Sequence, residues 1–115
     1  MKYTAFIYYN NIRICKISYL DNDSDFYKYT FEPIYEALDQ LAETDFKGIP
    51  GIDLALRKKK YIRENLQPVF IFERNPIRKK KNFSALQRIE QKTLLEYLTD
   101  NKTNYFGDKL TIRSL

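Results

Sequence analysis

The start of the chain holds two β-rich runs that only a pair of asparagines separates. Tyr3–Tyr9 and Ile12–Leu20 are rich in the aromatic and β-branched residues that strands favour, and Asn10-Asn11 joins them. Asparagine tolerates the positive φ angles that a two-residue turn requires. The spacing therefore predicts a β-hairpin, so the fold of this chain is expected to begin with an antiparallel pair of strands.

Two helices and one buried strand are predicted in the middle of the chain. Pro33 suits the first turn of a helix, and apolar residues follow it with helical spacing, so Pro33–Glu43 is predicted to be helical. Asp53 is a good N-cap for a second helix over Leu54–Leu66. The unbroken apolar run Val69–Phe72 is typical of a strand that is buried on both faces.

The last third of the chain predicts an amphipathic helix and a short strand. Ser84 matches the start of a capping box, and the helix that follows extends to Leu98. A strand is predicted over Leu110–Ile112, and Phe26–Phe31 alternates in a way that is compatible with a strand after the hairpin. The predicted order is β-β-(β)-α-α-β-α-β. It indicates a single α+β domain over residues 1–115, with a small mixed β-sheet and about three helices packed on it.

The two halves of the chain carry opposite charge. Residues 1–56 hold five Lys/Arg and nine Asp/Glu, a net charge of −4, whereas residues 57–115 hold fifteen and six, a net charge of +9. Such polarity favours an anionic partner, most often a nucleic acid. The alternative is that both halves fold together and leave a surface that is merely dipolar.

Two basic runs, Arg57–Lys60 and Arg78–Lys81, concentrate this charge. Aromatic residues interleave with them, and this combination is typical of nucleic-acid surfaces. If a helix over Leu54–Leu66 is followed by a strand that turns back along it, the two runs meet in one patch. A solvated basic face without a ligand stays open as the alternative. The candidate partner-binding residues are Arg57, Lys58, Lys59, Lys60, Tyr61, Arg63, Arg74, Arg78, Lys79, Lys80, Lys81 and Phe83.

The sequence contains no recognisable catalytic or metal site. It has no histidine, which excludes Ser-His and Cys-His catalysis and histidine-based zinc sites. Cys15, the only cysteine, lies within a predicted strand and is expected to be a buried thiol. The acidic residues from Asp21 to Glu32 match the ligand spacing of an EF-hand loop, but Phe26 stands where that loop needs glycine. We therefore expect no enzyme activity, no cofactor and no calcium site.

The stretch Tyr61–Leu115 resembles the middle of a serine-recombinase catalytic domain. The shared order is helix, strand, basic loop, a helix that begins FSALQ, and the segment GDKLTI. The arginine- and serine-bearing N-terminal motif of that family is absent, since the first predicted strand ends in Tyr8-Tyr9-Asn10. The arginine-rich motif expected after the last strand is missing too, so the resemblance implies no activity for this chain.

These features predict a small non-enzymatic binding protein that engages nucleic acid or a nucleoprotein complex through residues 57–83. The abundant Lys, Asn, Ile, Tyr and Phe have AT-rich codons, which is compatible with a phage or mobile-element source. Two alternatives stay open: an anti-CRISPR-type inhibitor that binds a Cas effector, and a metal-dependent nuclease-like enzyme that uses Asp/Glu, with Asp53, Glu73 and Glu90 as candidates. No apolar stretch is long enough to span a membrane and the lone cysteine fits a reducing compartment, so a cytoplasmic location is expected. The oligomeric state stays open.

Overall fold

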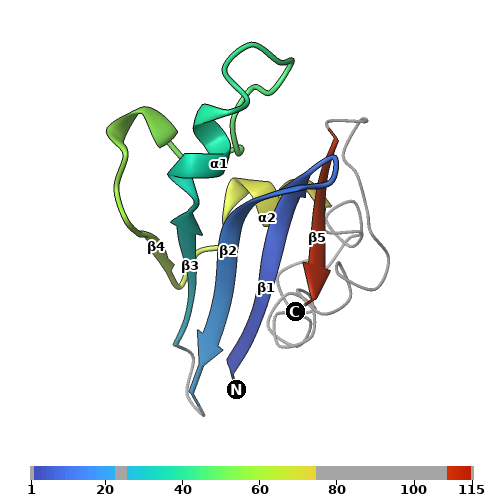
Figure 1. Cartoon of the computed structure of the whole chain (residues 1–115). Helices are drawn as coiled ribbons and strands as arrows, with labels where there is room; N and C mark the ends of the chain where they lie inside the picture. The colour runs from blue at the N-terminus through green and yellow to red at the C-terminus, as the bar shows by residue number, and fades with distance from the viewer. Residues whose placement is uncertain (1, 23–25, 75–108, 115) are drawn as a thin grey trace.

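The structure is a computed structural model that describes residues 2–22, 26–74 and 109–114 of the chain (Figure 1). Its central feature is one sheet of five described strands in the order β4-β3-β2-β1-β5. Every pair of neighbours in it runs antiparallel, so the predicted α+β class is confirmed but the sheet is not mixed. The strands are β1 (Lys2–Tyr9), β2 (Ile12–Asp21), β3 (Tyr27–Pro33), β4 (Tyr61–Glu64) and β5 (Leu110–Ser114).

The predicted hairpin is confirmed, and it contains an irregularity that the sequence did not reveal. Asn10 takes a φ of 54° in the turn between β1 and β2. Ile7 pairs with Cys15, but Tyr8 pairs with Arg13, so Ile14 is an extra residue in β2 and forms a β-bulge. The carbonyl of this bulged residue accepts a hydrogen bond of 2.8 Å from the Ile34 N–H, which fixes the chain as it leaves β3.

The third strand and the first helix form close to their predicted places. Pro33 is the last residue of β3 rather than the start of a helix, a position where its missing N–H costs little. Helix α1 covers Tyr35–Asp39, after which the chain continues in turns. The last strand is also confirmed, since β5 includes the predicted Leu110–Ile112.

The helix predicted over Leu54–Leu66 is wrong. Only a 3₁₀ turn forms, η1 (Leu54–Leu56), although Asp53 does cap it by accepting a 3.1 Å hydrogen bond from the Ala55 N–H. Arg57 then takes a left-handed conformation with a φ of 49°, which ends the turn. The residues that follow pair with β3 as strand β4, so long-range strand pairing prevails over the local helical pattern.

The strand predicted over Val69–Phe72 is also wrong, because this segment begins helix α2 (Val69–Arg74). Phe70 and Ile71 are fully buried, whereas Val69 and Phe72 are 49% and 41% exposed. A short apolar run fits a buried helix segment as well as a buried strand, and its burial here is one-sided. The third helix, predicted over Ser84–Leu98, lies outside the described residues.

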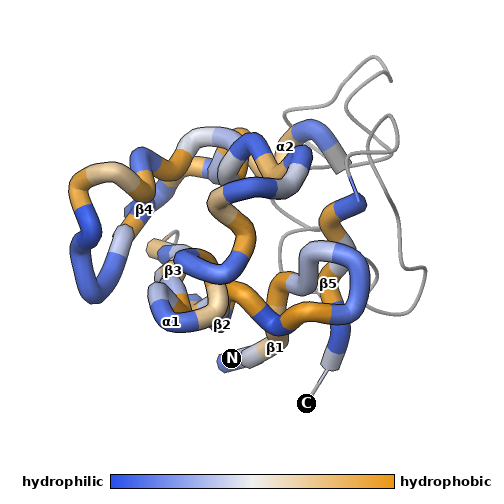
Figure 2. Tube along the Cα trace, turned by 45° about the horizontal axis from the view of Figure 1, so that its top comes forward, coloured by the Kyte–Doolittle hydropathy of each residue, from blue (hydrophilic) through white to orange (hydrophobic). Residues whose placement is uncertain are grey.

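One face of the sheet carries the hydrophobic core. Figure 1 shows α2 behind β1 and β2, and its Phe70 and Ile71 belong to the same buried cluster as Ile7, Ile17 and Phe31. Gly51 lies so close to α2 that a Cβ atom there would be 2.9 Å from the Val69 Cβ. Figure 2 shows the hydrophilic segment before β4 projecting to one side of the molecule. Among the described residues, no helix is long and apolar enough to cross a membrane.

Candidate functional site

The second face of the sheet, which we call the open face, is not covered by any helix that the structure describes. Side chains alternate along a strand, so the residues between the core positions point to this face. Cross-strand pairing arranges them in rows, for example Thr4 beside Ser18 and Ser18 beside Thr30. The open face comprises Lys2, Thr4, Phe6, Tyr8, Arg13, Lys16, Ser18, Leu20, Lys28, Thr30, Glu32, Lys60, Ile62, Glu64, Thr111 and Arg113.

A hollow of about 360 Å³ lies on the open face over β1, β2 and β3. Its floor includes three hydroxyl side chains, and four lysines surround it. Only one of these four ammonium groups has a carboxylate partner among the described residues, since Lys16 Nζ lies 4.0 Å from Glu32 Oε2. We call this feature the lysine hollow; it consists of Lys2, Lys16, Lys28 and Lys60 around Thr4, Ser18 and Thr30.

Next to the hollow, aromatic rings and guanidinium groups of β1, β2 and β5 pack together as the arginine–aromatic cluster (Phe6, Tyr8, Arg13, Arg113). The Arg13 Cζ lies 4.0 Å from the Phe6 ring centroid, and the Arg13 Nε donates a 3.0 Å hydrogen bond to the Tyr8 hydroxyl. The Arg113 Cζ lies 4.3 Å from the Tyr8 ring centroid. Both distances are within the range of cation–π attraction, which orients the two guanidinium planes.

Arg13 belongs to this cluster only because of the β-bulge. In a regular strand Arg13 would share a face with Cys15 and Ile17, both of which are fully buried. The extra residue, Ile14, reverses the alternation and turns Arg13 to the face that holds Lys16 and Ser18. The bulge therefore adds a cation to the open face.

The open face is strongly positive. It carries six cations, namely Lys2, Arg13, Lys16, Lys28, Lys60 and Arg113, against the two carboxylates Glu32 and Glu64, a net charge of +4. Four of these cations come from residues 1–56, the half of the chain whose net charge is −4. The sum over each half of the sequence therefore hides the polarity that the sheet creates.

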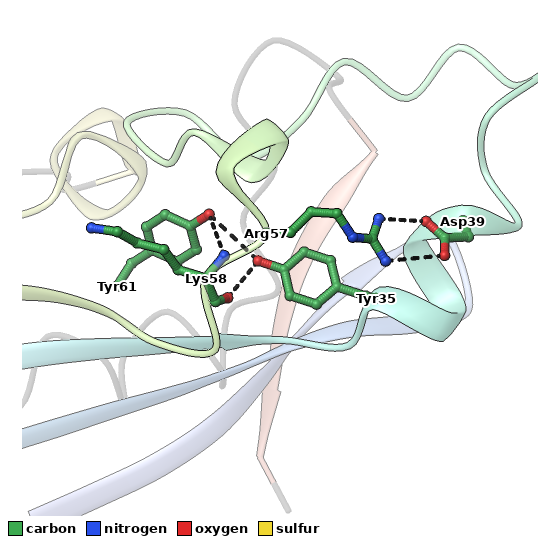
Figure 3. A network of polar contacts seen from close by, with 5 residues as sticks. All are labelled: Tyr35, Asp39, Arg57, Lys58 and Tyr61. Atoms are coloured by element: carbon green, nitrogen blue, oxygen red, sulfur yellow. Dashed lines mark hydrogen bonds and ion pairs between the residues drawn. The ribbon is translucent and has the colours of Figure 1, made fainter.

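All four residues of the first predicted basic run are exposed, but two of them make contacts within the molecule. Figure 3 shows a bidentate salt bridge between Arg57 and Asp39, with Nη–Oδ distances of 2.9 and 3.2 Å. The hydrogen bond from Arg57 lowers the pKa of the Asp39 carboxyl. The same guanidinium lies 4.5 Å from the centroid of the Tyr35 ring. Arg57 thus ties the loop before β4 to α1 through intramolecular contacts, although its side chain stays exposed.

Lys58 and Tyr61 continue this network (Figure 3). The Lys58 carbonyl accepts a hydrogen bond from the Tyr35 hydroxyl, and the Lys58 N–H donates to the Tyr61 hydroxyl at 3.3 Å. Tyr61 donates in turn to the Asp53 carbonyl at 2.6 Å. With 3% of its surface exposed, Tyr61 does not present a ring for stacking. The network leaves Lys59 exposed and brings Lys60 to the edge of the lysine hollow.

The remaining predicted site residues are dispersed or lie outside the description. Arg63 donates 2.9 and 3.0 Å hydrogen bonds to the carbonyls of Gly51 and Ile62. Arg74 is the last residue of α2, and its side chain is not described. Neither the helix over Leu54–Leu66 nor the strand over Val69–Phe72 forms, so the geometry that was expected to bring the two basic runs into one patch is absent. The second run, with Arg78, Lys79, Lys80, Lys81 and Phe83, lies outside the described residues.

Three of the acidic and thiol groups considered for chemistry, Cys15, Asp21 and Asp53, have structural surroundings. Cys15 is fully buried, and burial raises the pKa of its thiol to about 12, so the thiol stays protonated. Asp53 caps η1, and Asp21 accepts a 2.9 Å hydrogen bond from the Tyr19 hydroxyl. Asp23 and Asp25 of the acidic loop, like Glu90, lie outside the described residues.

The alternation of residues along the predicted first strand could have indicated the open face, but the basic runs drew attention elsewhere. Lys2, Thr4, Phe6 and Tyr8 occupy alternate positions along β1, between the core residues.

Comparison with known proteins finds no matching protein-family model, no similar protein of curated function and no similar solved structure.

Proposed function

We propose that this protein is a non-enzymatic binding protein whose open face binds nucleic acid. The observation that carries the proposal is the excess of four positive charges on a sheet surface that also presents aromatic rings. A phosphate backbone supplies a row of negative charges, and its neutralisation by Lys and Arg dominates nucleic-acid affinity. The cations and the aromatic rings of the open face therefore both have a counterpart in such a partner.

The position of the lysines supports an anionic partner independently of their number. Lys2 and Lys28 lie in the same cross-strand row, on either side of Leu20, and no carboxylate within ion-pair distance is found for either among the described residues. Glu64 continues this row as the residue directly opposite Lys28, so two carboxylates offset part of the repulsion among the six cations of the open face and leave a net charge of +4. A bound polyanion removes that repulsion.

The first basic run extends this surface at the β4 edge. Lys60 borders the hollow and the exposed Lys59 precedes it, held in place by the network around Tyr35 and Tyr61. We propose that Lys59 and Lys60 contact the phosphate backbone beyond the hollow. We propose the run Arg78–Lys81 as a further contact with the phosphate backbone.

The experiment compares two variants that lose the same charge at different places. In Lys2→Gln/Lys28→Gln/Lys60→Gln the three changes lie on the open face; in Lys47→Gln/Lys58→Gln/Lys109→Gln they lie away from it. Fluorescence anisotropy with a labelled oligonucleotide gives the affinity at several salt concentrations. We expect the open-face variant to reduce the log–log salt slope by about two to three, because each lost phosphate contact removes roughly 0.7 to 0.9.

The control variant separates a local contact from the general effect of net charge. We expect it to change the slope by less than about one, the value for a single contact. Equal losses in both variants, or the absence of binding by the wild-type protein at low salt, would contradict the proposal.

A further inference from the structure

The geometry points to a single-stranded nucleic acid as the partner of the open face, with bases stacked on the arginine–aromatic cluster and phosphates over the lysine hollow. This inference rests on the proposed function and adds the strandedness of the ligand and the division of labour within the face. Three features support it: the cluster presents planar groups, contacts within the protein hold these groups in place, and the cluster adjoins the lysine hollow.

The cluster presents planar groups to solvent. Arg13 is exposed, and its guanidinium covers the half-buried Phe6 ring at 4.0 Å. One side of that guanidinium therefore faces the ring, and the other side is available to a ligand. Bases that leave a helix stack on aromatic rings and on guanidinium planes, whereas the ammonium group of a lysine binds a phosphate as a point charge.

These planar groups are held in place before any ligand binds. The Arg13 Nε is bonded to the Tyr8 hydroxyl at 3.0 Å. From the β5 side, the Arg113 Nη2 donates to the Asn10 carbonyl at 3.0 Å and to the Asn11 Oδ1 at 3.1 Å while its Cζ lies over the Tyr8 ring. Because side chains that are already ordered lose little entropy on binding, such a surface favours stacking.

The cluster and the hollow are contiguous. Phe6 pairs across β1 and β2 with Lys16 of the hollow, and Thr4 of the hollow is the next open-face residue along β1. From Tyr8 to Lys2 the face extends on the order of 20 Å along the strand. One strand of several nucleotides can therefore place its bases on the cluster while its phosphates lie over the ammonium groups.

A double-stranded nucleic acid could contact the lysine hollow but not the arginine–aromatic cluster. Its bases are stacked on one another, so their faces cannot reach Arg13 or Tyr8, and its edges are read by a helix or ribbon that enters a groove. Within residues 2–22, 26–74 and 109–114, the open face is a sheet surface with no helix on it. A duplex would contact the lysines and leave the cluster unused.

The test uses a fluorescein-labelled oligothymidylate and a duplex of the same length with the full-length protein. Arg13→Lys keeps the positive charge but removes the plane, and Lys28→Gln is the matched change in the hollow. We expect the wild-type protein to bind the single strand more tightly. Arg13→Lys should weaken single-strand binding by about 5- to 150-fold, the range for the loss of one stacked base, and leave duplex binding unchanged.

Lys28→Gln should weaken both ligands alike and lower the salt slope, which Arg13→Lys should not change. A single strand with a fluorescent adenine analogue adds a direct readout, because its emission is quenched when the base stacks. The inference is overturned if the wild-type protein binds both ligands equally and Arg13→Lys leaves the quenching intact. In that outcome a loss in Lys28→Gln still supports the proposed function, whereas no binding of either ligand by the wild-type protein overturns both. Thermal melting of each variant verifies folding.

Discussion

The two faces of the sheet are built from the same strands and hydrogen bonds, yet their aromatic residues have different neighbours. On the covered face, Tyr19, Tyr27 and Tyr29 contact one another, with ring centroids 5.1 to 6.2 Å apart. On the open face, Phe6 and Tyr8 are contacted by the guanidinium groups of two arginines. Aromatic residues on one side therefore stabilise the fold by mutual burial, and those on the other are half-buried beneath cationic side chains.

This difference follows from strand alternation together with the single bulge. Along β1, residues of one parity are buried and those of the other are half-exposed. The bulge at Ile14 shifts this parity in β2 and gives the open face Arg13. One extra residue thus changes which side chains the protein presents without a change in the order of strands.

The largest expected effect is on the free energy of unfolding when one phenylalanine from each face is replaced. Phe31 is fully buried on the covered face, so Phe31→Ala should lower that free energy by about 3 to 5 kcal/mol. Phe6→Ala loses a half-buried ring and its contact with Arg13, for which we expect about 1 kcal/mol. Urea unfolding followed by circular dichroism measures both. Equal losses would show that the open face is part of a core and would remove the contrast between the faces.

Alkaline pH should lower the free energy of unfolding through groups that are buried on the covered face. Burial raises the pKa of the Cys15 thiol to about 12, and it raises the pKa values of the Tyr19 and Tyr29 hydroxyls as well. In the unfolded chain these groups ionise between about pH 8.5 and 10. The folded state therefore holds more protons than the unfolded state above that range, and the free energy of unfolding falls as the pH rises.

For Cys15 alone, the free energy of unfolding is unaffected below about pH 8 and falls by at most roughly 4 kcal/mol as the pH approaches 12. Urea unfolding between pH 7 and 10.5 measures this decrease. Cys15→Ala should flatten its onset near pH 9, before the tyrosines contribute. If the wild-type and Cys15→Ala proteins lose stability in parallel from pH 8 to 10, the buried thiol does not cause the decrease.

The sequence was sufficient for the strands whose own residues show a clear β pattern, whether their partner is close along the chain, as in the hairpin, or distant, as for β5 and β1. The hairpin, with Asn10 at a positive φ, the third strand and the terminal strand all form as predicted. The helix prediction over residues 54–66 was wrong because Tyr61 pairs with Phe31, a distant partner that no local pattern reveals. The strand prediction over Val69–Phe72 was wrong because four apolar residues fit a helix and a strand equally well. Packing against the sheet decides between the two.

The candidate site was missed for a related reason. A run such as Arg57–Lys60 is visible in the sequence, but the side chain of Arg57 and the backbone of Lys58 hold a loop together. The open face draws its cations from four strands and the residue before β4, and they become neighbours only through strand register. Register could be predicted for β1 and β2 from the hairpin, although the bulge that exposes Arg13 could not.

The smallest expected effect distinguishes the open-face lysines from the rest of the molecule. No carboxylate lies within ion-pair distance of Lys28 or Lys60 among the described residues, although Glu64 is directly opposite Lys28 across β3 and β4. Replacement of both lysines by Gln therefore removes repulsion from four other cations and a weaker attraction to Glu64. We expect Lys28→Gln/Lys60→Gln to change the free energy of unfolding by no more than about 0.5 kcal/mol, and to raise it slightly at low ionic strength. Lys16→Gln is the control, since its 4.0 Å contact with Glu32 is exposed and contributes between about 0 and 1 kcal/mol. Urea unfolding at 10 mM and 1 M salt measures the difference, because screening over about 30 Å and 3 Å respectively retains or removes the repulsion. A loss of stability in the double variant that persists in 1 M salt would mean that these lysines support the fold, and the open face would then lose its distinction from the covered one.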